Sequence, residues 1–231
     1  MHIVYIVSVF VKRNLQNRRR GIVRIIRLVD IIRVTRSLTA AEVEAAYRVG
    51  VFPMASVEQG MVTWHKPKRR AVLPLDGFHV SRSLQRVLKQ HRYEVTFDRA
   101  FGDVMHACSG ESDVVRDGVW ISPEFKRVYG ELQQQGKAHS VEIWVGDELA
   151  GGVYGVHLGG GFFAESKFHR QTNMSKVALA ELVFRLRERG FALMEVQYVT
   201  EHLAQFGVIE ISDRDYQSRL RFALEMHCDF P

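Results

Sequence analysis

Three β-rich segments joined by very short connections constrain the fold of this chain more than any other feature of its sequence. They cover residues 139–145 (HSVEIWV), 148–156 (ELAGGVYGV) and 160–166 (GGFFAES). A Gly-Asp pair separates the first two segments, and a glycine-rich turn separates the last two. Connections this short join antiparallel neighbours. We therefore expect an antiparallel meander in the second half of the chain.

A helix and a further strand are expected after this meander. Apolar residues recur with helical spacing in residues 175–189, and Gly190 follows at the expected end. Residues 191–199 (FALMEVQYV) have the composition of a strand. This order of elements predicts an α+β fold with a mixed sheet. A chain of 231 residues, 46% of them hydrophobic, can bury a substantial core.

The net charge of +6 is concentrated at the amino terminus. Residues 1–36 hold nine Lys or Arg and one Asp, whereas residues 37–231 carry a net charge of −2. Binding to nucleic acid would therefore require a local basic patch. Cys108 and Cys228 match neither a metal-ligand nor a redox spacing, so we expect no metal site and a cytoplasmic protein.

Residues 1–36 are interpreted as an extension of the folded body. The apolar run at residues 1–11 would measure about 16 Å as a helix, too short for a hydrocarbon core of about 30 Å. Residues 21–36 place arginines among Ile and Val, which predicts a basic amphipathic helix lying on a membrane or on RNA. An accessory extension without a role is the alternative. Membrane contact is thus one of two open interpretations.

Two helices are expected before the meander. Thr39 followed by Glu42 is typical of a capping box, which predicts a helix that ends near Gly50. Residues 37–72 are taken as a small N-terminal domain with a loop from residue 56, and residues 73–231 as the main domain. A second helix is expected in residues 80–92. One face of it carries three basic side chains, which either contact phosphate or are simply solvated: Arg82, Arg86 and Lys89.

Polar residues on the last expected strand suggest a site. Glu195 and Gln197 are two residues apart, so the strand period directs both side chains to one face. Either they share a site or that face is exposed to water. Glu165 is a single carboxylate that follows an apolar, glycine-rich run. It either serves a site or forms a structural ion pair with Arg170 or Lys176.

Several segments occur in one order along residues 38–222, namely YRVGVFP, RRAV, SRSL, AFGDVMHAC, VWISPEF, AHSVEIW, GGVYGV, FFAESKF, NMSKVAL and HLAQFGVIEI. Together they resemble the signature segments of the leucyl/phenylalanyl-tRNA–protein transferase family. The agreement of many segments in one order is far more specific than any single motif. The resemblance implies a main domain with an acetyltransferase-like (GNAT) fold, preceded by a small N-terminal domain.

The resemblance implies a reaction that needs no small-molecule cofactor. A leucyl or phenylalanyl group, with methionyl as a further candidate, would pass from its tRNA to the N-terminal amine of a protein that begins with Arg or Lys. The product would enter the N-degron degradation pathway. An aminoacyl ester is already activated, and an α-amine with a pKa of about 7.7 to 8 is partly nucleophilic near neutral pH. The site must chiefly hold the two in near-attack geometry.

The same resemblance assigns catalytic roles to three residues. Gln197 would accept a hydrogen bond from the attacking amine, with Glu195 behind it. The family's usual residue at the latter position is Asp, so the longer side chain of Glu195 raises the question of a slower enzyme. Glu165 would bind and orient the incoming peptide. On the residues alone, these assignments stay open.

Substrate-binding positions are also implied. The aminoacyl side-chain pocket would comprise Val153, Phe162, Leu179 and Met194, all of which also suit an ordinary core. The terminal adenosine would stack on Trp120. Met54 stands where the family has a second tryptophan, and Trp64 is a candidate substitute. The resemblance favours phosphate contact for Arg82, Arg86 and Lys89.

Two rival functions remain at this stage. An acyl-CoA-dependent N-acyltransferase would require a glycine-rich loop at a helix N-terminus to cradle pyrophosphate, and residues 166–176 lack glycine there. We therefore expect no CoA. A catalytically impaired relative that binds tRNA or a membrane is the second rival, because of Glu195, Met54 and the N-terminal extension.

Overall fold

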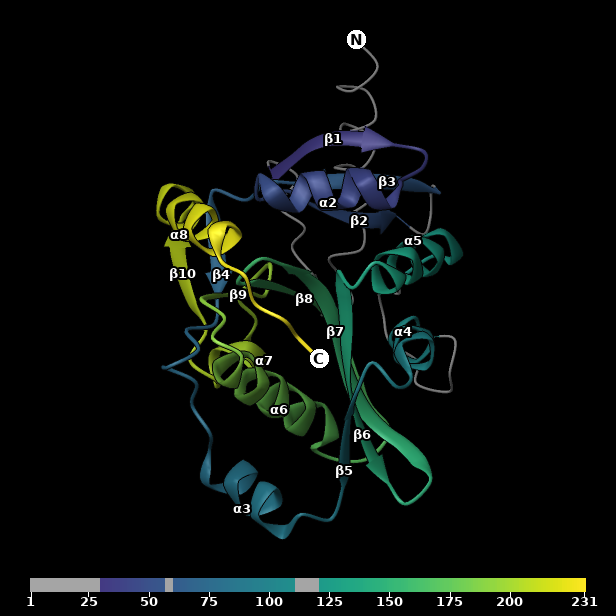
Figure 1. Cartoon of the computed structure of the whole chain (residues 1–231), viewed down its shortest axis with the longest axis vertical. Coiled ribbons are helices and arrows are strands. Elements are labelled where there is room, and N and C mark those ends of the chain that lie inside the picture. The colour runs from purple at the N-terminus through teal and green to yellow at the C-terminus, as the bar shows by residue number, and fades with distance from the viewer. Residues whose placement is uncertain (1–29, 57–59, 111–120) are drawn as a thin grey trace, which may run out of the picture.

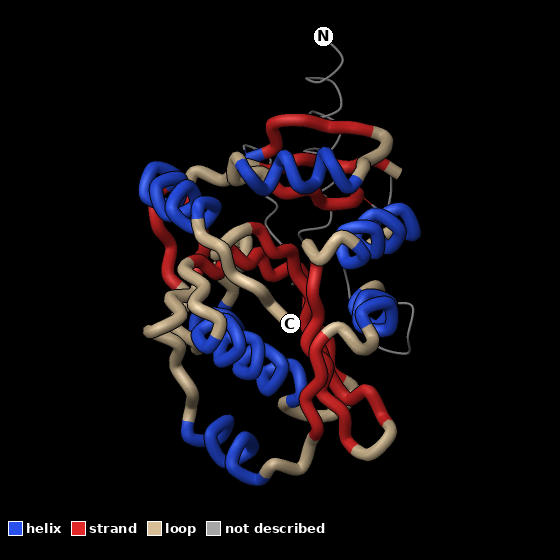
Figure 2. Tube along the Cα trace, in the orientation of Figure 1, coloured by secondary structure: helices blue, strands red, loops and turns tan. Residues whose placement is uncertain are grey.

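The computed structural model describes residues 30–56, 60–110 and 121–231. Their strands form two sheets, a three-stranded sheet in the order β1-β3-β2 and a seven-stranded sheet in the order β10-β4-β9-β8-β7-β6-β5. Figure 1 shows the small sheet and its helix at one end of the molecule, above the large sheet. Figure 2 shows helices on both sides of the strands of the large sheet. The expected α+β class is confirmed.

The small sheet is antiparallel and packs against one helix. Its strands are β1 (Ile31–Thr35), β2 (Phe52–Ser56) and β3 (Met61–His65), and its helix is α2 (Ala40–Arg48). The expected capping box at the start of α2 is present, with Thr39 accepting from the backbone N–H of Glu42.

Two expectations about this region are wrong. Residues 31–35 form a strand rather than part of an amphipathic helix, because Ile, Arg and Val also fit the period of two and their backbone pairs with β3. Residues 61–65 and 69–72, expected in a loop, form strands β3 and β4. Residues 1–29 lie outside the described residues, so the remainder of the expected basic helix and the apolar run are not described.

The large sheet contains the expected meander. Strands β6, β7 and β8 are antiparallel neighbours, whereas β8 and β9 run parallel. The antiparallel pairing of β4 with β10 and β9 completes one edge, and β5 forms the other. Their bounds are β4 (Arg69–Val72), β5 (Glu94–Phe97), β6 (Ala138–Val145), β7 (Glu148–Leu158), β8 (Gly161–His169), β9 (Leu193–Glu195) and β10 (Ile209–Ser212).

Helices cover both faces of the large sheet. Adjacent residues of β8 illustrate the division, because Phe162 packs in the cluster with α6 and Phe163 packs in the cluster with α4 and α5. No helix among the described residues is long and apolar enough to cross a membrane. The helices after α2 are α3 (Arg82–Gln90), α4 (Phe101–Cys108), α5 (Pro123–Gln134), α6 (Met174–Glu188), α7 (Glu201–Ala204) and α8 (Asp213–Glu225).

The two sheets do not divide at residues 36 and 72, the domain boundaries expected from the sequence. A division after residue 36 would separate β1 from the small sheet, to which its backbone hydrogen bonds join it. A division after residue 72 would assign β4 to the small unit, although β4 lies between β10 and β9 in the large sheet. The small sheet therefore comprises residues 31–65, and the large sheet begins at residue 69.

Candidate active site

Glu165 lies at an irregularity in the pairing of β7 with β8. Tyr154 pairs with Ser166 and Gly155 pairs with Ala164, so Glu165 between them has no partner residue on β7. An extra residue of this kind forms a β-bulge, which redirects side chains and is common beside active sites. The side chain is only 9% exposed.

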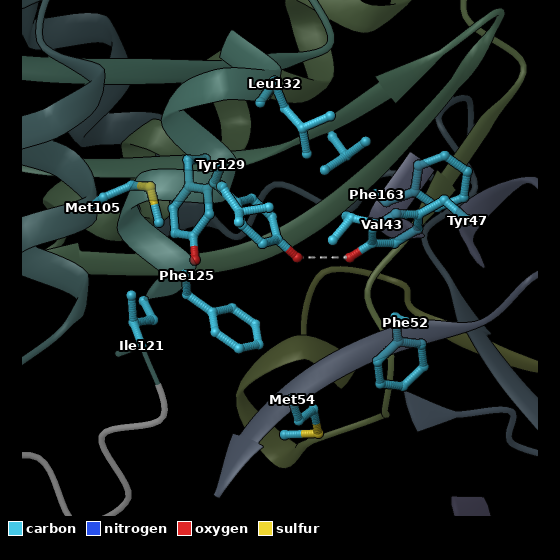
Figure 3. Close-up of a cluster of buried hydrophobic side chains, with 14 of the residues drawn as sticks. Val43, Tyr47, Phe52, Met54, Met105, Ile121, Phe125, Tyr129, Leu132 and Phe163 are labelled. Carbon is cyan, nitrogen blue, oxygen red and sulfur yellow. Dashed lines mark hydrogen bonds between the residues drawn. The ribbon is translucent and has the colours of Figure 1, made fainter. Parts of the chain in front are cut away.

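Glu165 is held by hydroxyl and amide donors. The Tyr47 hydroxyl donates to Oε1, and Gln197 Nε2 donates to Oε2 at 3.0 Å. The hydroxyls of Tyr47 and Tyr129 are 3.3 Å apart, and the dashed line in Figure 3 joins them. Glu165 thus connects helices α2 and α5 to the segment that follows β9.

The alternative ion pairs proposed for Glu165 are not formed. The guanidinium of Arg170 donates to the carbonyl of Leu149 at 2.8 Å, and Lys176 donates to Gln205 at 3.5 Å. The hydrogen bonds of Glu165 among the described residues go to Tyr47 and Gln197 instead.

Burial decides the ionisation of this carboxyl. Loss of solvent raises the pKa of Glu165 to about 8; the hydrogen bond from Tyr47 opposes this shift and the negative charge of Glu195 adds to it. Burial also raises the pKa of Tyr47 well above its usual range, so this hydroxyl keeps its proton and donates it. Near neutral pH, Glu165 is therefore mostly protonated, with a smaller ionised fraction.

Glu195 forms a separate buried network. Its carboxylate accepts from Arg70 Nη2 at 2.5 Å and from the Tyr216 hydroxyl at 2.5 Å. The side chains of Arg70 and Glu195 are 0% and 2% exposed. Arg70 also donates to the carbonyl of Gly50 and lies 4.0 Å above the Tyr216 ring centre. This pair connects β4 and β9 to α8 and to the end of the small sheet's helix.

Gln197 does not continue the strand of Glu195. Strand β9 ends at Glu195, and Gln197 has a φ of 62°, in the left-handed region that non-glycine residues rarely adopt. The alternation of faces therefore stops between the two residues. The carboxylate that contacts Gln197 is Glu165, from the neighbouring strand, rather than Glu195.

Strands β8 and β9 stop pairing beside this contact. Their last paired residues are Phe163 and Glu195, and the side chains of Glu165 and Gln197 bridge the two chain segments beyond that point. The site thus lies where parallel neighbours part.

The four proposed pocket residues lie in one buried cluster on the α6 side of the sheet. Phe162 on β8 pairs with Met194 on β9, with Val153 on β7 and Leu179 on α6 in the same cluster. All four are buried, so their geometry fits a pocket wall and an ordinary core alike. Tyr47 and Tyr129 belong to the cluster on the other side. The point where β8 and β9 stop pairing lies between these two clusters.

The structure separates the proposed adenosine-stacking residues. Met54 is opposite Thr63, whereas Trp64 is opposite Pro53, so Met54 and Trp64 point to different faces of the small sheet. Figure 3 shows Met54 near Phe52 in the cluster with Ile121 and Phe125.

Trp64 is already engaged. It is 2% exposed, its indole N–H donates to Thr35 Oγ1 at 3.0 Å, and the guanidinium of Arg33 lies 5.4 Å from its ring centre. Trp64 therefore cannot substitute for Met54 in this conformation. Trp120 lies outside the described residues.

Helix α3 presents the three proposed phosphate-binding residues to solvent. Leu84 is buried, and Arg82, Arg86 and Lys89 are all exposed. Among the described residues these three basic side chains form no ion pair, so their charge is available to an anionic partner. No group of three or more metal-ligating side chains is present in the described part of the chain.

Sequence reasoning missed the partners of both carboxylates. The helical pattern around residues 40–48 places Tyr47 on an apolar face without a further role. No pattern in the sequence gives a role to Tyr129, Arg70 or Tyr216. Tyr47, Arg70 and Tyr216 come from elements distant in sequence from the carboxylates that they contact, and Tyr129 is linked to Glu165 through Tyr47. Their only signal was that Tyr47 and Arg70 lie inside segments that carry the family resemblance.

Comparisons with known proteins identify the family. The model of the leucyl/phenylalanyl-tRNA protein transferase family matches residues 72–221. A protein named leucyl/phenylalanyl-tRNA–protein transferase from Paramagnetospirillum magneticum is 50% identical over 190 residues, which cover 82% of this chain and 90% of that protein. A protein of the same name from Salinibacter ruber is 48% identical over 185 residues, 80% of each chain.

Solved structures show only distant likeness. A ribosomal-protein-alanine N-acetyltransferase from Brucella melitensis has a TM-score of 0.35 and 14% identity, covering 48% of this chain and 85% of that one. L-PGS from Bacillus licheniformis has a TM-score of 0.42 and 11% identity, covering 67% of this chain and 56% of that one. These scores are too low to support a functional argument. The sequence matches are decisive: the chain belongs to the leucyl/phenylalanyl-tRNA–protein transferase family.

Proposed function

We propose that this chain transfers a leucyl or phenylalanyl group from tRNA to the amino terminus of proteins that begin with Arg or Lys. Membership of the family makes it an aminoacyltransferase that uses aminoacyl-tRNA. The contact of Gln197 with Glu165, where β8 and β9 part beside an apolar cluster, is the observation that supports the site. The acceptor class and the residue roles are the proposed part.

The reaction exchanges an ester for an amide. The α-amine nitrogen attacks the ester carbonyl carbon, a C–N bond forms, and the bond to the ribose oxygen of tRNA breaks. The proton released by the amine passes to the departing ribose oxygen, directly or through water. Because the ester is already activated, the proposal needs no cofactor and no acyl-CoA.

Gln197 can orient the amine because of its contact with Glu165. Its amide nitrogen donates to Glu165, which leaves its carbonyl oxygen to accept from the attacking amine. An amide is a very weak base, so we assign to it orientation rather than proton removal. When Glu165 is ionised, its negative charge favours the positive charge that develops on the nitrogen.

The two carboxylates also suit a cationic acceptor. Glu165 and Glu195 are close enough for the charge of one to raise the pKa of the other, although Arg70 offsets part of the charge of Glu195. A peptide that begins with Arg or Lys brings an α-amine and a side-chain cation to this region. Electrostatic complementarity of this kind favours basic over acidic N-terminal residues.

The tRNA would be held mainly through its backbone. The exposed basic residues of α3 match the charge of phosphate without reading base sequence, which suits a protein that accepts several tRNAs. We keep Trp120 and Met54 as proposed contacts of the terminal adenosine. Charged tRNA and nascent proteins are available in the cytoplasm, where we place the reaction and its N-degron products.

A transfer assay tests the proposal. The protein is incubated with labelled leucyl-tRNA and matched peptides that begin with Arg or Asp, and a parallel reaction supplies labelled acetyl-CoA instead. We expect label from leucyl-tRNA on the Arg peptide, little on the Asp peptide and none from acetyl-CoA. Binding of tRNA without labelling of either peptide would indicate the catalytically impaired relative.

A further inference from the structure

The end of the chain returns to the core beside the proposed aminoacyl pocket. After α8, residues 226–231 run from the edge of the large sheet to a position beside α6, as Figure 1 shows. Phe230 lies in a segment without helix or strand, yet it is 0% exposed. Its complete burial indicates a specific contact with the core.

Phe230 is held by rings from three strands. Its ring stacks on Phe162 of β8 with centroids 5.4 Å apart and planes at 25°. On β6, His139 stacks on it at 4.5 Å and 21°. Phe97 of β5 meets its edge at 5.9 Å and 79°.

The tail, residues 226–231, is held by isolated hydrogen bonds. Arg185 on α6 donates from Nε to the carbonyl of Phe230 at 2.9 Å, and the N–H of Met226 donates to the carbonyl of Ala223 at 3.1 Å. The His157 side chain bonds to the backbone of Cys228, whose thiol lies 3.6 Å from the carbonyl of Gly190. Residues 226–231 form no helix or strand of their own. The tail is therefore easier to displace than the hydrogen-bonded strands beside it.

Phe162 contacts both Phe230 and the backbone of β7 at Gly155. A Cβ atom placed on Gly155 would lie 2.5 Å from Phe162 Cε1, so the phenyl ring already covers the backbone of β7 closely. Phe162 cannot recede in that direction. A shift of its ring toward Phe230 requires Phe230 to move as well.

We propose that Phe230 is a specificity-determining residue, which sets the size of the side chain that the aminoacyl pocket accepts. This inference rests on the proposed function, because it requires Phe162 to line that pocket. A leucyl group fits with Phe230 seated, and a bulkier aromatic group must push Phe162 against Phe230. The limit on size therefore comes from a displaceable tail and not from the sheet.

Substitutions that change the volume at residue 230 test this role. Phe230→Leu and Phe230→Ala provide space, and Phe230→Trp removes it. We measure kcat/KM for transfer from leucyl-, phenylalanyl- and tryptophanyl-tRNA to one Arg-initiated peptide. Phe222→Ala is the matched control, because Phe222 lies on α8 and is 62% exposed.

The deciding quantity is the ratio of kcat/KM for tryptophanyl transfer to kcat/KM for leucyl transfer. We expect Phe230→Ala to raise it by about tenfold or more and Phe230→Leu by less, since one methylene in an apolar pocket changes selectivity by about 10-fold or more. Phe230→Trp should lower the ratio of phenylalanyl to leucyl transfer. Phe222→Ala should leave both ratios unchanged.

Failure of this inference and failure of the proposed function look different. If the wild-type protein transfers none of the three aminoacyl groups, the proposed function fails before any variant is compared. If the wild type is active and every Phe230 variant lowers all three rates by one common factor, Phe230 only stabilises the fold and the inference is overturned. Should Phe230→Ala not fold, as judged by circular dichroism, the smaller change in Phe230→Leu decides.

Discussion

From the buried ion pair of Arg70 with Glu195 we predict that one substitution stabilises or destabilises the protein according to which residue stands opposite it. Replacing Arg70 with methionine leaves the Glu195 carboxylate buried, with the Tyr216 hydroxyl as its remaining partner. Breaking a buried ion pair by removing one partner costs about 3–5 kcal/mol. Arg70→Met should therefore lower the free energy of unfolding by about that amount.

The effect of Glu195→Gln should reverse with the residue at position 70. With Arg70 present, the substitution leaves a buried guanidinium without its carboxylate and destabilises the protein by about 3–5 kcal/mol. In the Arg70→Met background, the same substitution removes an uncompensated charge while the new Gln side chain still accepts from Tyr216. We expect it to recover about 1–3 kcal/mol there, the cost of an unsatisfied buried group.

Urea denaturation of four proteins measures this reversal. The four proteins are the wild type, the two single variants and the double variant. Circular dichroism monitors their unfolding. Arg127→Met serves as the control, because the pair of Arg127 with Glu131 is exposed and such pairs contribute about 0–1 kcal/mol. If Glu195→Gln destabilises both backgrounds equally, the ion pair does not account for the burial of Glu195.

The remaining predictions concern catalysis, tRNA binding and pH. Gln197→Ala should lower the rate of transfer at least about 100-fold, as expected when reactants are no longer positioned. The affinity for tRNA, measured by filter binding, should stay unchanged. An equal loss of rate and affinity would contradict the orienting role. Replacing the three basic residues of α3 with alanine should reduce the slope of log affinity against log salt by about 1 for each phosphate that is no longer neutralised, whereas an unaltered slope would remove α3 from the tRNA interface. Because the pKa of Glu165 is raised to about 8 from 4.5, the folded state keeps a proton that the unfolded state releases. Stability should therefore fall as pH rises from about 4.5 to about 8, and Glu165→Gln should flatten that part of the curve of urea midpoint against pH; an identical slope in both proteins would argue against the raised pKa.

Local patterns were sufficient for the elements that depend on local interactions. The capping box at Thr39 and the short turns of the meander involve residues close in sequence, and the structure has both. The helix expected at residues 31–35 is wrong because their apolar and basic residues fit a helix and a strand equally well. The choice is made by β3, about thirty residues later, which a periodicity cannot detect.

The candidate site shows the same limit at the scale of single side chains. Glu165, Glu195 and Gln197 stood out in the sequence as polar residues beside apolar runs, and the family resemblance gave them roles. Their hydrogen-bond partners, however, come from α2, β4 and α8. The bulge at Glu165 depends on the register between β7 and β8. None of these long-range contacts leaves a signal in the spacing of a single sequence.

Gln197 bonds to a different carboxylate from the one that the strand period places beside it. A period of two places its side chain beside that of Glu195, but the left-handed backbone at Gln197 interrupts the strand and directs the amide to Glu165. For a residue other than glycine this conformation costs of order 1–3 kcal/mol, and it persists only where surrounding contacts impose it. The pairing of β8 with β9 ends just before this residue, and the hydrogen bond to Glu165 holds it there. The regular pattern therefore fails at the residue whose backbone is strained, because the period of two assumes a strand that has already ended at Glu195.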